Sequence, residues 1–349
     1  MWFSAIVLEL MKLLRRMTAA LSAATLAMTL SAVPATAFSS VAPSGIDVSG
    51  HQRGNGAPIQ WREVAADGQR FAFVKATEGE GWVNPHYLED VHAAHQAGLL
   101  VGTYHYARPA GDARAQAAHY AATLAAAPGH SLPPVLDIEV DEGLDPVQLQ
   151  GWVADFLAET EHLTGRTPMV YTYRYFWREH LADTDAFTRH PLWLAAYQND
   201  MPETVGGWDQ LTFWQRSDAG RVPGINGPVD LNLFNGTDGQ LTDFVAGNHV
   251  DLGGVLESGA GPAVLDGLGE GNTALAALIL AVESGLLPAD TLTGAARQAG
   301  IDPAVAGEIA DRVRGLLESG ELPVDDLLVM AENPDYSIGD LLILLANAG

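Results

Sequence analysis

The sequence predicts an α/β protein: an irregular TIM-like barrel of five strand-helix units plus three further strands, followed by a small all-α domain. Apolar runs of strand length recur eight times between residues 45 and 234. Stretches with helical spacing of apolar residues separate the first six runs. Loops rich in Gly, Pro and Asn join the last ones, and after about residue 250 aromatic residues become rare. Five strand-helix units in succession indicate a parallel sheet.

The expected elements follow from these two patterns. The strands are short runs of apolar and aromatic residues: 45–50, 71–77, 99–107, 134–140, 169–173, 192–197, 211–215 and 229–234. The helices repeat apolar residues about every 3.6 positions, and several begin with Asp, Asn or Pro: 59–67, 85–97, 112–127, 146–164 and 175–182. We therefore expect eight strands, five outer helices and an irregular closing side.

The beginning of the chain has the pattern of an export signal. Lys12, Arg15 and Arg16 precede an apolar run over 18–33, which ends in the small residues 35–37. Because this run is shorter than a bilayer span, a retained membrane anchor is the weaker alternative. We expect a secreted or wall-located protein with no membrane contact after cleavage. The expected organisation is a signal peptide (1–37), a linker (38–44), the barrel (45–240) and an acidic helical domain (250–349).

Composition excludes one class of partner. The 349 residues carry a formal net charge of -25, and the chain has a sequence pI of about 4.5. Nucleic-acid binding needs Lys and Arg aligned on phosphates, so this balance argues against it. The chain has no cysteine, so no disulfide stabilises the fold, and stability must come from a large core.

The fourth predicted strand contains two carboxylates. Side chains at i and i+2 of a strand share a face, so Asp137 and Glu139 should point together into the barrel. Two like charges held that close do not both ionise freely, and one carboxyl group then keeps its proton and serves as a general acid. The alternative is a strand end whose carboxylates meet solvent or a lysine.

Polar and aromatic residues lie at the ends of all eight predicted strands, where barrel enzymes place their reactive groups. Carboxylates walled by flat rings suit a sugar polymer, although about half of the aromatic residues should simply fill the core. We expect Glu78 and Glu80 to be solvated loop acids. No metal site is expected, because the histidines lack a matching ligand set. The strand-end residues are Asp47, Lys75, Glu78, Tyr104, His105, Tyr106, Asp137, Glu139, Tyr171, Tyr173, Tyr197, Gln198, Trp214, Gln215, Asp230 and Asn232.

Six motifs in order resemble glycoside hydrolase family 25, the lysozymes that cut peptidoglycan, over roughly residues 45–234. The resemblance implies an irregular barrel and hydrolysis of the β-1,4 bond between N-acetylmuramic acid and N-acetylglucosamine, without cofactor or metal. The motifs are Gly45-Ile46-Asp47-Val48-Ser49, Phe73-Val74-Lys75-Ala76-Thr77-Glu78-Gly79, Gly102-Thr103-Tyr104-His105-Tyr106, Leu136-Asp137-Ile138-Glu139, Phe213-Trp214-Gln215 and Val229-Asp230-Leu231-Asn232.

The resemblance also implies roles for single residues. Glu139 matches the general acid, and Asp137 matches the partner that orients the 2-acetamido group of the muramic sugar. Asp47 and Asp230 match two further acidic positions of the cleft. A substrate acetamide acting as nucleophile is the mechanism we favour. The positions that match cleft-lining, substrate-binding residues are Lys75, Tyr104, Tyr106, Tyr171, Tyr197 and Trp214.

The tail repeats a short motif, Glu-Ser-Gly-x-x-Pro, at residues 257–262, 283–288 and 318–323. Gly ends a helix and Pro suits a new start, so we expect short helices over apolar stretches such as 274–282, 304–317 and 338–346. The tail is neither aromatic nor basic, which favours a structural or protein-interaction bundle over a wall-binding module.

Three alternatives stay open at this point. The first is a carbohydrate-binding barrel that has lost catalysis, and the intact set of four acids argues against it. The second is a hydrolase of another N-acetylhexosamine glycan, such as chitin oligosaccharides. The third is an interaction protein whose function lies in the acidic tail.

Overall fold

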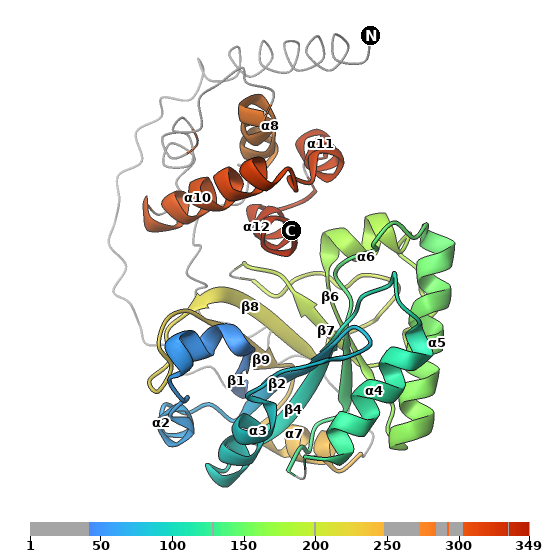
Figure 1. Ribbon diagram of the computed structural model, residues 1–349, viewed down its shortest axis with the longest axis vertical. Helices are drawn as coiled ribbons and strands as arrows, with labels where there is room; N and C mark the ends of the chain where they lie inside the picture. Colours follow the sequence, from blue (N-terminus) through green and yellow to red (C-terminus); the bar gives the residue numbers. More distant parts are fainter. Residues whose placement is uncertain are drawn as a thin grey trace. The chain divides into compact units, whose positions relative to one another are not determined.

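The computed structural model describes residues 42–127, 129–198, 200–247, 272–283, 292, 303–333 and 335–348. They form two compact units, one within residues 39–266 and one within 267–349. The expected signal peptide lies outside the described residues. Each unit is described by itself below (Figure 1).

The first unit is built on a nine-stranded sheet in the order β1-β9-β8-β7-β6-β5-β4-β2-β3. Strand β1 pairs with both β2 and β9, and this closes eight strands into a barrel while β3 stays outside, paired to β2. The pairs from β1 through β2, β4, β5, β6 and β7 to β8 are parallel, and β9 is antiparallel to both neighbours. The predicted barrel with an irregular closing side is confirmed. The strands are β1 (Ser44–Val48), β2 (Phe71–Glu78), β3 (Trp82–Val83), β4 (Leu100–Tyr106), β5 (Pro134–Asp137), β6 (Met169–Tyr173), β7 (Leu192–Ala195), β8 (Phe213–Gly220) and β9 (Val229–Phe234).

Helices surround this barrel on its outer face, and their ends follow local chemistry (Figure 1). The longest, α5, begins where the Asp145 carboxylate accepts from two backbone amides with Pro146 in the first turn, and it ends at Gly165 in the left-handed conformation. The five expected helices are present, and η1 and α7 are additional. The helices are η1 (Gly50–Gly56), α2 (Trp61–Ala66), α3 (Tyr87–Gln96), α4 (Ala113–Ala125), α5 (Pro146–Thr164), α6 (Arg174–His180) and α7 (Asp238–Val245).

The barrel interior is filled by aromatic rings below the level of the carboxylates. The Phe213 ring lies 5.0 Å from the Phe71 ring and 5.2 Å from the Phe73 ring, measured between centroids. A Cβ atom at Gly102 would come within 2.2 Å of the Phe73 ring, and one at Gly45 within 2.4 Å of the Phe71 ring. Glycine is therefore required at both positions, because the phenylalanine rings occupy the space of a side chain.

The second unit is helical in its described residues, with α8 (Asn272–Glu283), α10 (Pro303–Ser319), α11 (Val324–Glu332) and α12 (Ile338–Asn347). The third copy of the repeated motif separates two helices: Gly320, at φ +78°, follows α10, and Pro323 precedes α11. Arg312 donates to the backbone carbonyls of Leu345 and Ala346 at the end of α12. None of the helices described in the two units is long and apolar enough to cross a membrane.

Candidate active site

Four carboxylates converge where the parallel strands end. Asp137 is the last residue of β5, Asp47 lies in β1 opposite Asp230 of β9, and Glu139 follows β5 by two residues. Asp47, Asp137 and Glu139 are 5%, 4% and 9% exposed. The expected set of acids is thus brought to one end of the barrel, and most of it is withdrawn from water.

Two side-chain amides hold Asp47. Its Oδ2 atom accepts from Asn232 Nδ2 at 2.7 Å and from Gln215 Nε2 at 3.0 Å. Burial raises the pKa of Asp47, and hydrogen bonds from Gln215, Asn232 and Asp230 counteract this rise. Burial and the nearby charge of Asp47 raise the pKa of Asp230 well above its usual range. The pKa values of both residues are thus raised, and the pair shares a proton, while the hydrogen bonds from Gln215 and Asn232 favour the charged form of Asp47.

Asp137 and Glu139 form a second proton-sharing pair. Burial raises the pKa of Asp137 well above its usual range, the charge of Glu139 and the hydrogen bond between the two side chains raise it further, and the charge of Lys75 opposes the rise. The proton belongs to the pair rather than to one residue. The second oxygen of Asp137, Oδ1, is buried and has no hydrogen-bond partner among the described residues. This oxygen can therefore accept a hydrogen bond from a bound ligand.

The aromatic wall orients the amides. Tyr171 and Tyr197 donate their hydroxyls to Gln215 Oε1 at 2.8 and 3.3 Å, and Trp193 Nε1 donates to Asn232 Oδ1 at 2.8 Å. Since these donors occupy both amide oxygens, both NH₂ groups must face Asp47. Burial and the surrounding acids raise the pKa of Tyr171 and Tyr197 well above the usual phenol value, so both stay neutral donors. Tyr104 is held neutral in the same way.

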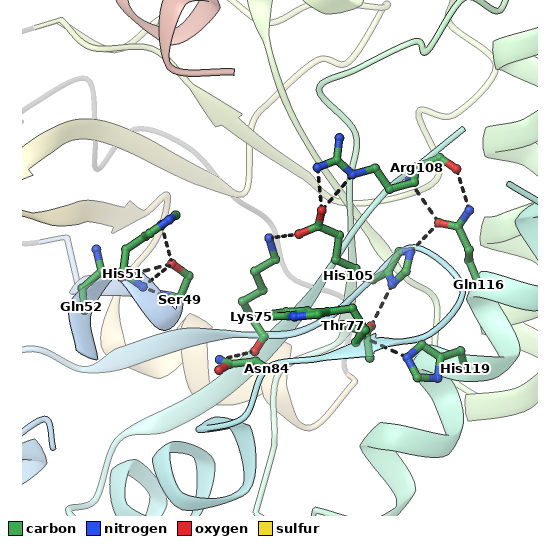
Figure 2. Close-up of polar contacts among 12 residues, drawn as sticks. Ser49, His51, Gln52, Lys75, Thr77, Asn84, His105, Arg108, Gln116 and His119 are labelled. Carbon is green, nitrogen blue, oxygen red and sulfur yellow. Dashed lines mark hydrogen bonds and ion pairs between the residues drawn. The ribbon is translucent and has the colours of Figure 1, made fainter. Parts of the chain in front are cut away.

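A charged cluster lies against the ring of Tyr106, the residue opposite Asp137 in the sheet, and its cations Lys75 and Arg108 are labelled in Figure 2. Lys75 Nζ donates to Glu78 Oε2 at 2.6 Å, while Arg108 donates to Glu78 Oε1 through Nε at 2.8 Å and Nη2 at 2.6 Å. Lys75 Nζ also lies 4.5 Å from the centre of the Tyr106 ring. Burial opposes ionisation of Glu78, but its two cationic partners outweigh burial and lower its pKa. Glu78 is therefore a bridging ion-pair residue, and its expected place as a solvated loop acid was wrong.

Trp214 does not lie among these residues. It is fully buried on β8, and its indole nitrogen donates to the Ala196 carbonyl at 2.7 Å. Its neighbour Gln215 points into the barrel, so Trp214 must point outward. Trp214 is thus not placed as the cleft-lining residue we expected, whereas the buried side chains of Gln215 and Asn232 hold Asp47 from the inner face and Trp193 holds Asn232. The alternation of strand side chains is the signal that would have assigned them, since each shares the inner face with Asp47 or Asp137.

A barrel with two proton-sharing carboxyl pairs at the carboxyl ends of its strands, walled by tyrosine and tryptophan, is the site of a glycosidase. Within the described residues, no group of three or more acidic or histidine side chains is arranged to hold a metal ion.

Comparison with known proteins identifies the family. The model of glycosyl hydrolases family 25 matches residues 46–225, and the chain belongs to this family. It is 40% identical over 209 residues to the uncharacterized protein YegX of Escherichia coli K12, covering 58% of this chain and 73% of that protein. It is 35% identical over 207 residues to lysozyme M1 of Streptomyces globisporus, covering 56% of this chain and 69% of that protein.

Solved structures agree with this placement. The bacterial lysozyme of Streptomyces coelicolor superposes with a TM-score of 0.55 at 32% identity, covering 60% of this chain and 99% of the lysozyme. The muramidase of Trichobolus zukalii gives a TM-score of 0.53 at 32% identity, covering 59% of this chain and all (100%) of the muramidase. The chain is a glycoside hydrolase of the lysozyme class.

Proposed function

We propose that this protein is an exported muramidase that hydrolyses the β-1,4 bond between N-acetylmuramic acid and N-acetylglucosamine in peptidoglycan. The observation that carries the proposal is the buried, proton-sharing Asp137–Glu139 pair at the end of β5, with one Asp137 oxygen unpartnered. A general acid must hold a proton near neutral pH, and the pair meets this requirement.

Glu139 is the general acid in this proposal. It gives its proton to the glycosidic oxygen as the bond between that oxygen and the anomeric carbon of the muramic sugar breaks. The hydrogen bond between Asp137 and Glu139 places the two carboxyl groups closer together than the ~5–5.5 Å of retaining pairs or the ~6.5–9.5 Å of inverting pairs. Asp137 therefore does not stand across the bond as a nucleophile or as a base for water.

The substrate's own acetamide supplies the nucleophile. Its carbonyl oxygen attacks the anomeric carbon, and Asp137 Oδ1 accepts the acetamide N–H, which fills the vacant hydrogen-bonding position of that atom. Water then attacks the anomeric carbon of the cyclic intermediate and returns a proton to Glu139. The Asp47–Asp230 pair, held by Gln215 and Asn232, places one negative charge near the developing positive charge of the sugar ring.

The leader pattern of residues 1–37 supports export in this proposal, and the place of action would be the cell wall or the medium. The acidic helical unit would serve as a structural or protein-interaction module, because the whole chain has only three basic residues beyond position 250: Arg297, Arg312 and Arg314.

The test is lysis of purified walls by the chain from residue 38 and by its Glu139→Gln variant, with the reducing ends of the released fragments identified. We expect muramic acid reducing ends, and a loss of about three orders of magnitude or more in the variant. Glu63→Gln, an exposed acid on α2, is the matched control. Equal rates for Glu139→Gln and wild type would remove Glu139 as the acid. Absence of lysis, with binding retained, would favour the silent carbohydrate-binding barrel, and other reducing ends would favour another N-acetylhexosamine glycan.

A further inference from the structure

One tryptophan of the barrel differs from the rest. Trp82 is 44% exposed, whereas the other tryptophans described in the barrel are at most 8% exposed. It lies on β3, the two-residue strand that pairs with β2 outside the closed barrel. An exposed indole on so short an element contributes little to the core, so core packing does not explain why a tryptophan occupies this surface position.

The strand register connects Trp82 to the acid pair. Trp82 lies opposite Glu78, Glu78 lies opposite Tyr106, and Tyr106 lies opposite Asp137. Residues directly opposite one another project from the same face of a sheet. Trp82 therefore lies on the same face as Asp137, three strand spacings away. At ~4.8 Å per spacing, their separation along the sheet is about 14 Å. This exceeds the width of one sugar ring.

The segment that carries Trp82 is fixed rather than loose. Glu80 Oε1 accepts from the Asp112 amide at 2.7 Å, and the Trp82 carbonyl accepts from His119 Nε2 at 3.2 Å. Lys75 Nζ lies 5.4 Å from the centre of the indole ring. The contacts of Lys75 and His119 are drawn in Figure 2. A ring held in place before binding loses little conformational entropy when a ligand stacks on it.

We propose that Trp82 is a distal sugar-binding platform, on which an N-acetylhexosamine ring of the same glycan strand stacks while another sugar occupies the acid pair. The inference rests on the proposed function for the identity of the glycan. Flat indole surface suits the apolar face of a pyranose. Lys75 and Arg108, which lie against the Tyr106 ring between Trp82 and Asp137, are both paired with Glu78. The site is therefore built for a strand several sugars long.

The test compares Trp82→Ala with Val83→Ala, which removes a 42%-exposed side chain from the other face of the same strand. Binding of peptide-free octasaccharides and disaccharides from peptidoglycan is measured by calorimetry with both changes made in the Glu139→Gln background. We expect Trp82→Ala to weaken octasaccharide binding roughly five- to tenfold and to leave disaccharide binding unchanged. Val83→Ala should weaken neither, and Trp82→Tyr should restore most of the octasaccharide affinity.

Steady-state kinetics give an independent readout, in which Trp82→Ala should raise KM for long strands and leave kcat unchanged. Equal octasaccharide affinities for Trp82→Ala and Val83→Ala would overturn the inference. So would equal losses for the two oligosaccharides, or failure of Trp82→Tyr to restore binding. Failure of the proposed function looks different: the wild type would release no muramic reducing ends, while the binding comparison would still report on Trp82.

Discussion

Asn232 Nδ2 donates to Asp47 Oδ2 across 2.7 Å, joining two antiparallel strands that close the barrel. The bond favours the charged form of a carboxylate whose pKa is raised by burial. Closure of the fold and electrostatics of the site thus depend on the same contact.

Asn232→Ala should lower kcat/KM by about 10- to 100-fold, because a hydrogen bond to a buried charge contributes about 1.5–3 kcal/mol. Trp193 would lose its acceptor in the same change. The control is Asn235→Ala, which removes a buried amide that donates to the Leu211 carbonyl, away from the acids. Equal loss of activity in both variants would mean that Asn232 acts only through stability, as measured by thermal unfolding.

Trp214→Phe should reduce stability and leave KM unchanged. The indole is fully buried and its hydrogen bond to the Ala196 carbonyl would be lost, at a cost of about 1–3 kcal/mol in the free energy of unfolding. Urea denaturation and kinetics on the same preparation check both parts. A raised KM with unchanged stability would contradict the outward orientation of this side chain.

Asp137→Asn should make stability less dependent on pH. The pKa of Asp137 is raised in the folded protein, so the folded state binds more protons than the unfolded state between the ordinary carboxyl pKa of about 3.9 and the raised value. The free energy of unfolding therefore falls as pH rises through this interval. Asparagine does not ionise, so the variant should have a larger free energy of unfolding than wild type at the upper end of this pH interval.

Thermal unfolding from about pH 4 to about pH 8 measures this difference. Asp209→Asn, an exposed acid on a loop, serves as the control and should follow the wild type. Parallel curves of stability against pH for wild type and Asp137→Asn would show that folding does not raise the pKa of the Asp137 carboxyl group.

Lys75→Met should move the alkaline limb of the pH–rate profile to higher pH, by about one pH unit. The Lys75 charge opposes the raised pKa of Asp137, and its removal lets that pKa rise further. Arg70→Met removes a cation from the exposed ion pair with Asp238, and its profile should match that of the wild type. A shift toward lower pH in Lys75→Met would contradict the assignment of the proton to the Asp137–Glu139 pair.

Much of the barrel could be predicted because its strands are short apolar runs, and helices with apolar residues about every 3.6 positions separate the first six runs from one another. Elements without a strong pattern were missed, namely the two-residue strand β3 and the short helices η1 and α7. Their place is set by pairing or packing with neighbours distant in sequence. The stop-and-start pattern at residues 318–323 was confirmed, because Gly and Pro act through local backbone geometry.

The four acids were identified from their place at strand ends, whereas the residues that tune them were not all identified. Gln215 and Trp214 are neighbours on one strand, and choosing between them requires knowing which face lines the barrel. That choice depends on register across strands, including the irregularities in the β8–β9 pairing. The prediction for Glu78 was wrong because it also depended on a contact between distant residues: its partner Arg108 lies thirty positions away along the chain.

A series of packed side chains connects Gly102 with Asp47, two strands away in the barrel. Phe73 fills the space against Gly102 and stacks on Trp193 at 4.3 Å, and Trp193 donates to the asparagine that holds Asp47. A methyl group at Gly102 would clash with the Phe73 ring, the first member of this series of contacts. Space left empty at one backbone position is thus a condition for the packing that supports the asparagine bound to Asp47.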